Sequence, residues 1–403
     1  RIVRREDQLV QQYQNAKNEA KKAFGIDDIF IEKYLEGPKH IEVQVLGDNH
    51  GNCVHLYERD CSIQRRHQKV IEITPALSIS EEQRQNICSD ALKIASAVNY
   101  RNACTVEFLI DKQGDHFFIE MNPRIQVEHT ITEMTTGIDI VQSQILIAQG
   151  LPLNHESIGI TSQASIQPRG YAIQARLTTE DPSNHFAPDT GKIDFYRTSA
   201  GFGIRLDGGN GFTGAEITPY YDSLLFKLTS WSNSFEGAIQ KSKRALNECN
   251  IRGVKTNLPF LLNVLNHPTF KNGDCDTKFI ENNPDLLDIQ HTPDHIQKTL
   301  TFIGNKVVNE TNAAKPDFNV PVVPKISGIT GLSGTKQILD TSGPEGVVKW
   351  IKAQDKLLLT DTTYRDAHQS LTATRMRTVD TVSYTHLRAH ETRYTISYAV
   401  FCV

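Results

Sequence analysis

Two glutamates, Glu107 and Glu120, stand on apolar runs that predict a β-hairpin. The runs cover residues 104–110 and 116–122, and a polar turn is predicted between them. If the runs pair, Glu107 lies opposite Glu120, and Asn122 follows on the same face because side chains alternate along a strand. Like charges that face each other destabilise a sheet, whereas Mg²⁺ takes carboxylate ligands together with substrate phosphates. The hairpin therefore predicts a divalent-cation site.

More polar side chains follow at alternate positions. Arg124, Gln126 and Glu128 come directly after the hairpin in the string EMNPRIQVEH, residues 120–129. A lone pair of glutamates would be read more simply as solvated surface charge, since most charged residues are exposed. The added guanidinium, amide and carboxylate favour a site for phosphate chemistry.

Two strings resemble the signatures of the biotin carboxylases, which are ATP-grasp enzymes. One is Glu107 with EMNPRIQVEH, and the other is ERDCSIQRRHQK at residues 58–69. The resemblance extends from Arg1 to about residue 284. It implies an α+β protein: an ATP-grasp fold that is truncated at its N-terminus, followed by the biotin carboxylase C-terminal subdomain.

The resemblance implies a role for each of these residues. Glu107 and Glu120 would bind Mg²⁺ or Mn²⁺ with help from Asn122, and Glu128 would be the general base that deprotonates bicarbonate. Bicarbonate would be bound by Lys69, Arg124, Gln126 and the backbone of Val127. The planar fork of an arginine suits such an oxyanion.

The resemblance also implies contacts to ATP and to biotin. The ATP-binding residues would be Glu32, Lys33, Leu35, His40, Gln64 and His67. Arg205 would stabilise the biotin enolate, and Asp222 would help to shape the biotin pocket. Plainer interpretations exist: the run 64–69 alone could be a solvated basic face, and a lone histidine such as His67 is usually structural.

The composition is that of an ordinary globular protein. Among 403 residues, 38% are hydrophobic and 22% are charged, and the formal net charge is −4. This charge gives no signature of nucleic-acid binding, and no apolar stretch approaches the length of a membrane span. The seven cysteines form no Cys-x-x-Cys pair, so reduced thiols are expected. We expect a bacterial cytoplasmic protein, with the mitochondrial matrix as an open alternative.

Periodicity and capping signals predict the elements that would position the site. A strand-like segment spans residues 29–46, with clean alternation over 40–46, and a capping box begins at Ser80. Helices are predicted at residues 6–24, 80–98, 138–149, 235–246 and 257–265.

A second resemblance appears near the C-terminus. The string LLLTDTTYRDAHQS, residues 357–370, resembles the first strand of the carboxyltransferase barrel of pyruvate carboxylases, where active sites lie at the strand ends. By this resemblance Asp366 would bind the carboxyltransferase metal, and Arg365 and Gln369 would contact pyruvate. From residue 382 the resemblance stops, and the chain resembles translated sequencing-adapter read-through.

These observations divide the chain into five predicted parts. They are a partial ATP-grasp domain (1–150), the biotin carboxylase C-terminal domain (151–285), a linker or connector and allosteric region (286–355), the start of a TIM-type carboxyltransferase barrel (356–381) and a non-native tail (382–403). We expect that an N-terminal segment precedes Arg1. The sequence holds no glycine-rich phosphate loop and no Ala-Met-Lys-Met motif, so we expect little or no turnover from the 403 residues alone.

The predicted reaction is ATP-dependent carboxylation of biotin by bicarbonate through carboxyphosphate, within an enzyme that converts pyruvate to oxaloacetate. Its cofactors would be ATP, Mg²⁺ and biotin, the last on a biotinyl domain outside this chain. The family also implies a homo-tetramer and an acetyl-CoA activator. Two alternatives remain at this point: the biotin carboxylase subunit of an acyl-CoA carboxylase, and a nucleotide-binding module without catalysis.

Overall fold

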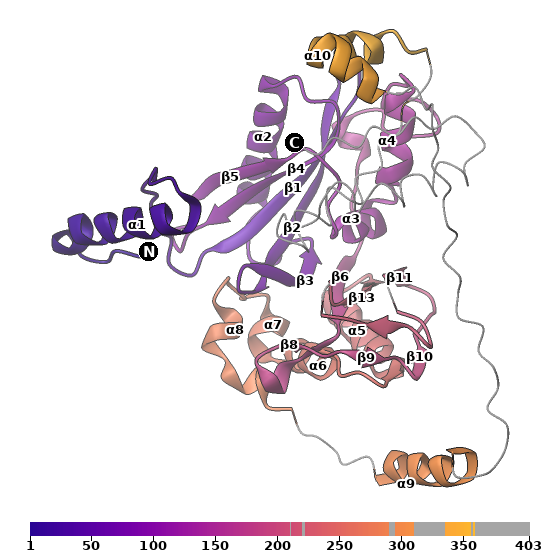
Figure 1. Ribbon diagram of the computed structural model, residues 1–403. Coiled ribbons are helices and arrows are strands. Elements are labelled where there is room, and N and C mark those ends of the chain that lie inside the picture. Colours follow the sequence, from indigo (N-terminus) through magenta and orange to yellow (C-terminus); the bar gives the residue numbers. More distant parts are fainter. Residues whose placement is uncertain (210, 220–221, 290–294, 310–334, 356–357, 359–403) are drawn as a thin grey trace.

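An eight-stranded antiparallel sheet forms the centre of the computed structural model (Figure 1). The structure describes residues 1–209, 211–219, 222–289, 295–309, 335–355 and 358. The strand order is β11-β13-β6-β3-β2-β1-β4-β5. The strands are β1 (Lys39–Gly47), β2 (Cys53–Arg65), β3 (Gln68–Thr74), β4 (Asn102–Ile110), β5 (His116–Asn122), β6 (Tyr171–Thr178), β11 (Ile204–Gly208) and β13 (Leu224–Ser232).

Alternation along β1 gives this sheet one apolar and one polar face. Ile41 and Val43 are fully buried in a core shared with α2 (Glu81–Ala97), while His40, Glu42 and Gln44 occupy the intervening positions. This confirms the strand predicted at residues 40–46. The polar face of the neighbouring strands is covered by α3 (His129–Thr136), which packs against β2, β3, β6 and β13.

The predicted hairpin is confirmed in its register. In the pairing of β4 with β5, Glu107 is the partner of Glu120 and Thr105 is the partner of Asn122. The capping box is also present, because the Ser80 hydroxyl accepts from the Gln83 backbone while the Gln83 side chain accepts from the Ser80 backbone.

One strand prediction was wrong at its start. Residues 29–38 form no strand, and β1 begins only at Lys39. Gly37 has a φ of 59°, in the left-handed region, and Pro38 has no N–H to donate to a neighbouring strand. The helix at the N-terminus was predicted well: α1 (Leu9–Phe24) ends at Gly25, whose φ is 78°.

Strands from both predicted domains share the sheet, because β3 pairs with β6. The other face of β6 and β13 carries α5 (Phe235–Glu248). Helix α6 (Leu258–Asn266) packs against α5, and α7 (Pro268–Asn272) packs against α6. α4 (Ile140–Ala148) and α8 (Phe279–Asn282) complete this part, with short strands β7 (Glu180–Asp181), β8 (Ala187–Pro188), β9 (Gly191–Lys192), β10 (Phe195–Arg197), β12 (Glu216–Ile217) and β14 (Asn250–Arg252). The helices predicted at 138–149, 235–246 and 257–265 are therefore present.

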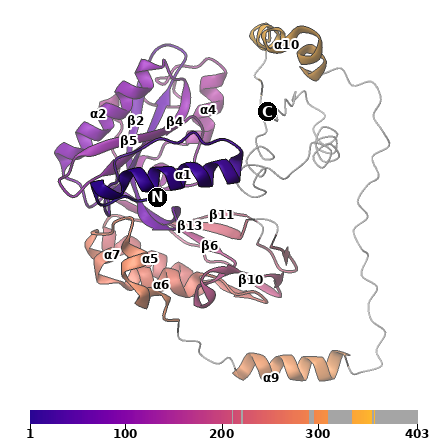
Figure 2. The same cartoon turned by 60° about the vertical axis from the view of Figure 1, so that its left-hand side comes forward.

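The predicted connector contains more helix than its composition suggests. It holds α9 (His295–Gly304), which stands apart from the sheet in Figures 1 and 2, and α10 (Thr335–Lys352). The barrel residues Arg365, Asp366 and Gln369 and the tail at 382–403 lie outside the described residues. Within the described residues, no helix has the length and apolar character needed to cross a membrane.

Candidate active site on the polar face of the sheet

Lys69 lies at the centre of a cluster of carboxylates. Its Nζ lies 2.6 Å from Glu42 Oε2, 2.5 Å from Glu128 Oε1 and 3.4 Å from Glu107 Oε1. The three carboxylates are at least 95% buried. Burial favours the neutral amine, yet the charges of Glu42 and Glu128 outweigh it and raise the pKa of Lys69. Lys69 is therefore a fixed cation in this site.

A second buried cation, Arg59, contacts the same glutamate as Lys69. Arg59 is fully buried on β2 and is the register partner of Glu42 on β1. Its Nε lies 2.5 Å from Glu42 Oε1, and its Nη groups donate to Gln44, Thr105, Thr132 and Gln126. Burial alone would raise the pKa of Glu42, but Arg59 and Lys69 together lower it to about 2. Glu42 is thus ionised, and each of its two carboxylate oxygens contacts a cation.

Glu107 is held by His40 as well as by Lys69. His40 Nε2 lies 2.7 Å from Glu107 Oε2, and Gln64 Nε2 lies 2.6 Å from His40 Nδ1. A donating amide at Nδ1 places the imidazole hydrogen on Nε2, from which it can donate to the carboxylate. Burial acts to raise the pKa of Glu107, but the hydrogen bond from His40 and the charge of Lys69 lower it to about 2.

Asn122 joins Glu107 to the more exposed Glu120. Its Nδ2 donates to Glu107 Oε1 at 2.9 Å and to Glu120 Oε1 at 3.0 Å, and Gln126 Nε2 donates to Glu107 Oε1 at 2.7 Å. One neutral amide group thus lies between two carboxylate oxygens on neighbouring strands. The donor set of two carboxylates and an amide, which can present oxygen when the amide is turned, fits a hard divalent cation.

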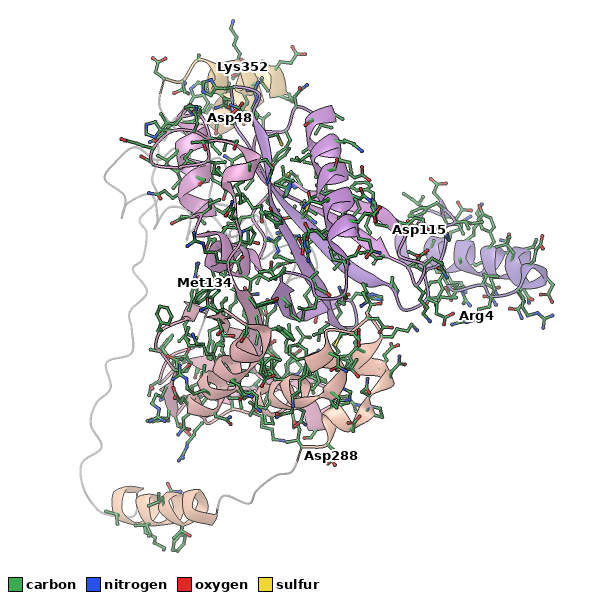
Figure 3. All side chains as sticks on the ribbon, turned by 180° about the vertical axis from the view of Figure 1, so that it is seen from behind. Arg4, Asp48, Asp115, Met134, Asp288 and Lys352 are labelled. Carbon is green, nitrogen blue, oxygen red and sulfur yellow. The ribbon has the colours of Figure 1, made fainter. Side chains whose placement is uncertain are left out.

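Glu128 is the N-cap residue of α3 and bridges two parts of the sheet. Lys69 on β3 contacts its Oε1, and Arg176 on β6 donates to its Oε2 at 3.1 Å. Arg176 also pairs with Glu72, which is fully buried on β3. Met134 marks α3 in Figure 3, where this helix lies between the upper and lower parts of the molecule.

Some predicted residues lie outside this cluster. Glu32 and Lys33 are exposed in the segment before β1, where the Lys33 ammonium lies 4.6 Å from the ring centroid of Phe117, and Leu35 is half-buried there. His67 is exposed in the turn between β2 and β3, with a φ of 64°. Arg124 is also exposed, and its Nη1 donates to the carbonyl of Ile125.

The two residues predicted for biotin also lie apart from Lys69. Arg205 on β11 pairs with Asp207 and with Glu133 on α3. Asp222 is exposed and accepts from the backbone of Leu224.

Sequence reasoning missed five charged residues of the cluster. They are Glu42, Arg59, Glu72, Arg176 and Lys227. The alternation of polar residues along β1 was a usable signal for Glu42. The string 171–178 carries a similar signal, with polar residues at 174 and 176 between apolar ones.

Family models match the two parts of this sheet. The model for the ATP binding domain of the carbamoyl-phosphate synthase L chain matches residues 1–156. The model for the biotin carboxylase C-terminal domain matches residues 174–282.

The chain is similar to two bacterial pyruvate carboxylases along most of its length. It is 56% identical to that of Staphylococcus aureus (strain Mu50 / ATCC 700699) over 390 residues, which cover 95% of this chain and 34% of the relative. It is 55% identical to that of Bacillus subtilis (strain 168), with 94% of this chain and 33% of the relative covered. The chain therefore spans about a third of the length of these relatives.

Solved structures give the same relationship. The Rhizobium etli pyruvate carboxylase with the allosteric activator acetyl coenzyme A is 49% identical, with a TM-score of 0.69 over 95% of this chain and 34% of that chain. The biotin carboxylase domain of a thermophilic 2-oxoglutarate carboxylase bound to bicarbonate is 48% identical, with a TM-score of 0.68 over 72% of this chain and 64% of that chain. The chain belongs to the biotin-dependent carboxylases and corresponds to the biotin carboxylase part of pyruvate carboxylase.

Proposed function

We propose that the polar face of the sheet binds bicarbonate and carries its ATP-dependent activation for the carboxylation of biotin. One observation carries the proposal: residues predicted from separate strings of the sequence meet at Lys69. Lys69 contacts Glu107 and Glu128, and Gln126 donates to the same oxygen of Glu107. Bicarbonate would replace part of the carboxylate contact at Lys69, since an ammonium can serve either oxyanion.

The chemistry needs a general base and cations that offset the charge of the oxyanions. Glu128 would take the proton of bicarbonate while one bicarbonate oxygen attacks the γ-phosphorus of ATP, and the bond to ADP breaks. Carboxyphosphate would then separate into carbon dioxide and phosphate, and a ring nitrogen of biotin would attack the carbon dioxide while the released phosphate takes the proton of that nitrogen. Lys69, and Arg124 after a side-chain rotation, would stabilise the charge that develops on the oxyanions.

Glu107, Glu120 and Asn122 would hold Mg²⁺ or Mn²⁺. When bound, the ion would offset the negative charge of the nucleotide phosphates. In this chain, His40 and Gln126 contact the two oxygens of Glu107 and favour its ionised form. The fit is supported by the place of the Asn122 amide between the two carboxylates.

The remaining site residues follow from the family resemblance. Glu32, Lys33, Leu35, His40, Gln64 and His67 would contact ATP, and the backbone of Val127 would donate to bicarbonate. Arg205 would face the biotin ring system after release from one of its carboxylate partners. Arg365, Asp366 and Gln369 would serve a carboxyltransferase site with its own divalent metal and pyruvate.

In the whole protein, we propose that this chain supplies the first half-reaction of a pyruvate carboxylase. The biotinyl domain and pyruvate would be its partners, and residues 286–355 would connect the two catalytic parts of an oligomer that responds to acetyl-CoA. The 94–95% coverage by pyruvate carboxylases favours this over an acyl-CoA carboxylase subunit, since the biotin carboxylase of Campylobacter jejuni covers 70% of this chain.

Binding of [¹³C]bicarbonate tests this proposal, because we expect little turnover from the 403-residue chain itself. The ¹³C linewidth would be followed in the presence of MgADP as the protein is added. We expect exchange broadening with the wild-type chain and its loss in Lys69→Met. Lys112→Met, in the exposed turn of the hairpin, is the matched control. Equal broadening in Lys69→Met and Lys112→Met would refute the assignment of the site.

A further inference from the structure

The loop that leads into α3 is held by side chains of β6 and β13, which belong to the other half of the sheet from β4 and β5. This loop carries Gln126, Val127 and Glu128, the residues that would surround bicarbonate. Two cations of the adjoining strands reach it: Lys227 on β13 donates from Nζ to the Val127 carbonyl at 2.9 Å, and Arg176 on β6 donates to Glu128 Oε2 at 3.1 Å.

These two cations are neighbours in the sheet. Lys227 is the register partner of Arg176 in the pairing of β13 with β6, and of Asp207 in the pairing of β11 with β13. Like charges at a directly opposed pair destabilise a sheet. Their presence side by side makes sense if both are directed at acceptors of the same loop, which the two hydrogen bonds show.

Further contacts from the same strands continue along α3. The Thr130 hydroxyl lies 2.7 Å from that of Thr229 on β13 and 2.5 Å from Gln174 Oε1 on β6. Arg205 on β11 contacts Glu133. Residues 127–133 are therefore fixed by β6, β11 and β13 through contacts that span 44 residues or more of the sequence.

We propose that Lys227 and Arg176 are positioning residues for bicarbonate: they fix the Val127 backbone and the Glu128 carboxylate against the oxyanion without touching it. This inference rests on the proposed function. Lys227 fixes the carbonyl of Val127 and so limits rotation of the backbone that would present its N–H. Arg176 occupies Oε2 of Glu128, which leaves Oε1 turned toward Lys69.

The two cations differ in what their loss would cost the fold. Arg176 also neutralises the buried Glu72, so Arg176→Met alone would leave a carboxylate without its partner. Lys227 is half-buried, and the contact with Val127 is to a backbone carbonyl. Lys227→Met is therefore the cleaner variant, and Arg176→Met is made together with Glu72→Gln.

The experiment measures two affinities on the full chain. [¹³C]Bicarbonate binding is followed by linewidth in the presence of MgADP, and Mn²⁺ binding is followed by the loss of the free-ion electron paramagnetic resonance signal. Lys39→Met is the control, because the charge of this half-buried lysine of β1 acts on Asp60. We expect Lys227→Met to weaken bicarbonate binding about tenfold, since a charge-assisted hydrogen bond is lost, and to leave Mn²⁺ affinity and the melting temperature unchanged.

A conservative variant of Lys227 shows whether its hydrogen bond or only the volume of its side chain is needed. Lys227→Arg keeps a donor for the Val127 carbonyl and should restore at least half of the lost bicarbonate affinity, and the double variant Glu72→Gln/Arg176→Met should behave like Lys227→Met. Bicarbonate affinity in Lys227→Met equal to that of Lys39→Met would overturn the inference. A parallel loss of Mn²⁺ affinity would also overturn it, because the role would then be structural. Absence of bicarbonate binding in the wild-type chain would instead overturn the proposed function.

Discussion

At the scale of single residues, the site is a balance of buried charges. A row of charged side chains crosses four strands, from Glu120 through Glu107 and Glu42 to Arg59. Buried ion pairs add little net stability over apolar packing, yet the loss of one partner is costly because the other charge stays buried. Such a row is better explained by binding and catalysis than by the needs of the fold.

Arg59 gives the sharpest stability prediction at this scale. Arg59→Met removes a fully buried guanidinium that contacts Glu42 and four other side chains. We expect the free energy of unfolding in urea to fall by about 3 kcal/mol or more. Arg244→Met removes an exposed ion pair with Glu248 and a long hydrogen bond to the Ala200 carbonyl, and it should cost roughly 0.5 kcal/mol. Similar losses in the two variants would show that the buried network is not coupled to folding.

His55 on β2 predicts a pH dependence of stability. Burial lowers its pKa from 6.5 to about 4, so the unfolded chain binds a proton at this residue before the folded chain does. Its contribution to stability is therefore full above pH 6.5 and is lost as the pH falls toward 4. In His55→Gln the urea-unfolding free energy should fall less over this range than in the wild type. Parallel pH profiles for the two proteins would contradict the prediction.

At the scale of elements, β3 belongs to both halves of the sheet. It pairs with β2 on one side and β6 on the other, and Ile71 is fully buried in the core with Ile173 and Leu228. The two predicted domains therefore share a hydrophobic core at this strand, and unfolding of one should accompany unfolding of the other.

Ile71→Ala tests this coupling. We expect a loss of about 2–5 kcal/mol in the free energy of unfolding, from the lost burial and the cavity. The fluorescence of Trp231 on β13, measured in a Trp350→Phe background, should shift in urea together with the far-ultraviolet circular dichroism. Ile119→Ala, at an exposed position of β5, is the control. If Ile71→Ala shifts the urea midpoint of the circular dichroism transition but not that of the fluorescence transition, the two halves of the sheet unfold separately.

Local sequence patterns predicted the helices and strands better than the tertiary contacts between them. The hairpin, the capped helix and the polar alternation of β1 each depend on neighbours within about ten residues, so periodicity and turn chemistry disclose them. Contacts such as Arg176 with Glu128 and Lys227 with Val127 span 48 and 100 residues. Alternation assigns a side chain to a face, but it does not fix which distant strand pairs with which.

At the scale of the whole molecule, one sheet brings together strings that are far apart in the sequence. Strand β3 brings Lys69, the β4–β5 hairpin brings Glu107, and the N-terminus of α3 brings Glu128 to one buried place on its polar face. The resemblance to biotin carboxylases predicted the residues, and the antiparallel order of the strands explains why they meet. We propose that bicarbonate binds at this place.

A crystal structure of the chain grown with MgADP and bicarbonate would test this binding site. We expect a planar anion within hydrogen-bond distance of Lys69 Nζ and the side chain of Gln126, with Glu128 facing it. The same crystals should show the metal between Glu107 and Glu120. An anion bound elsewhere, with Lys69 still held by its three carboxylates, would refute the assignment of the site.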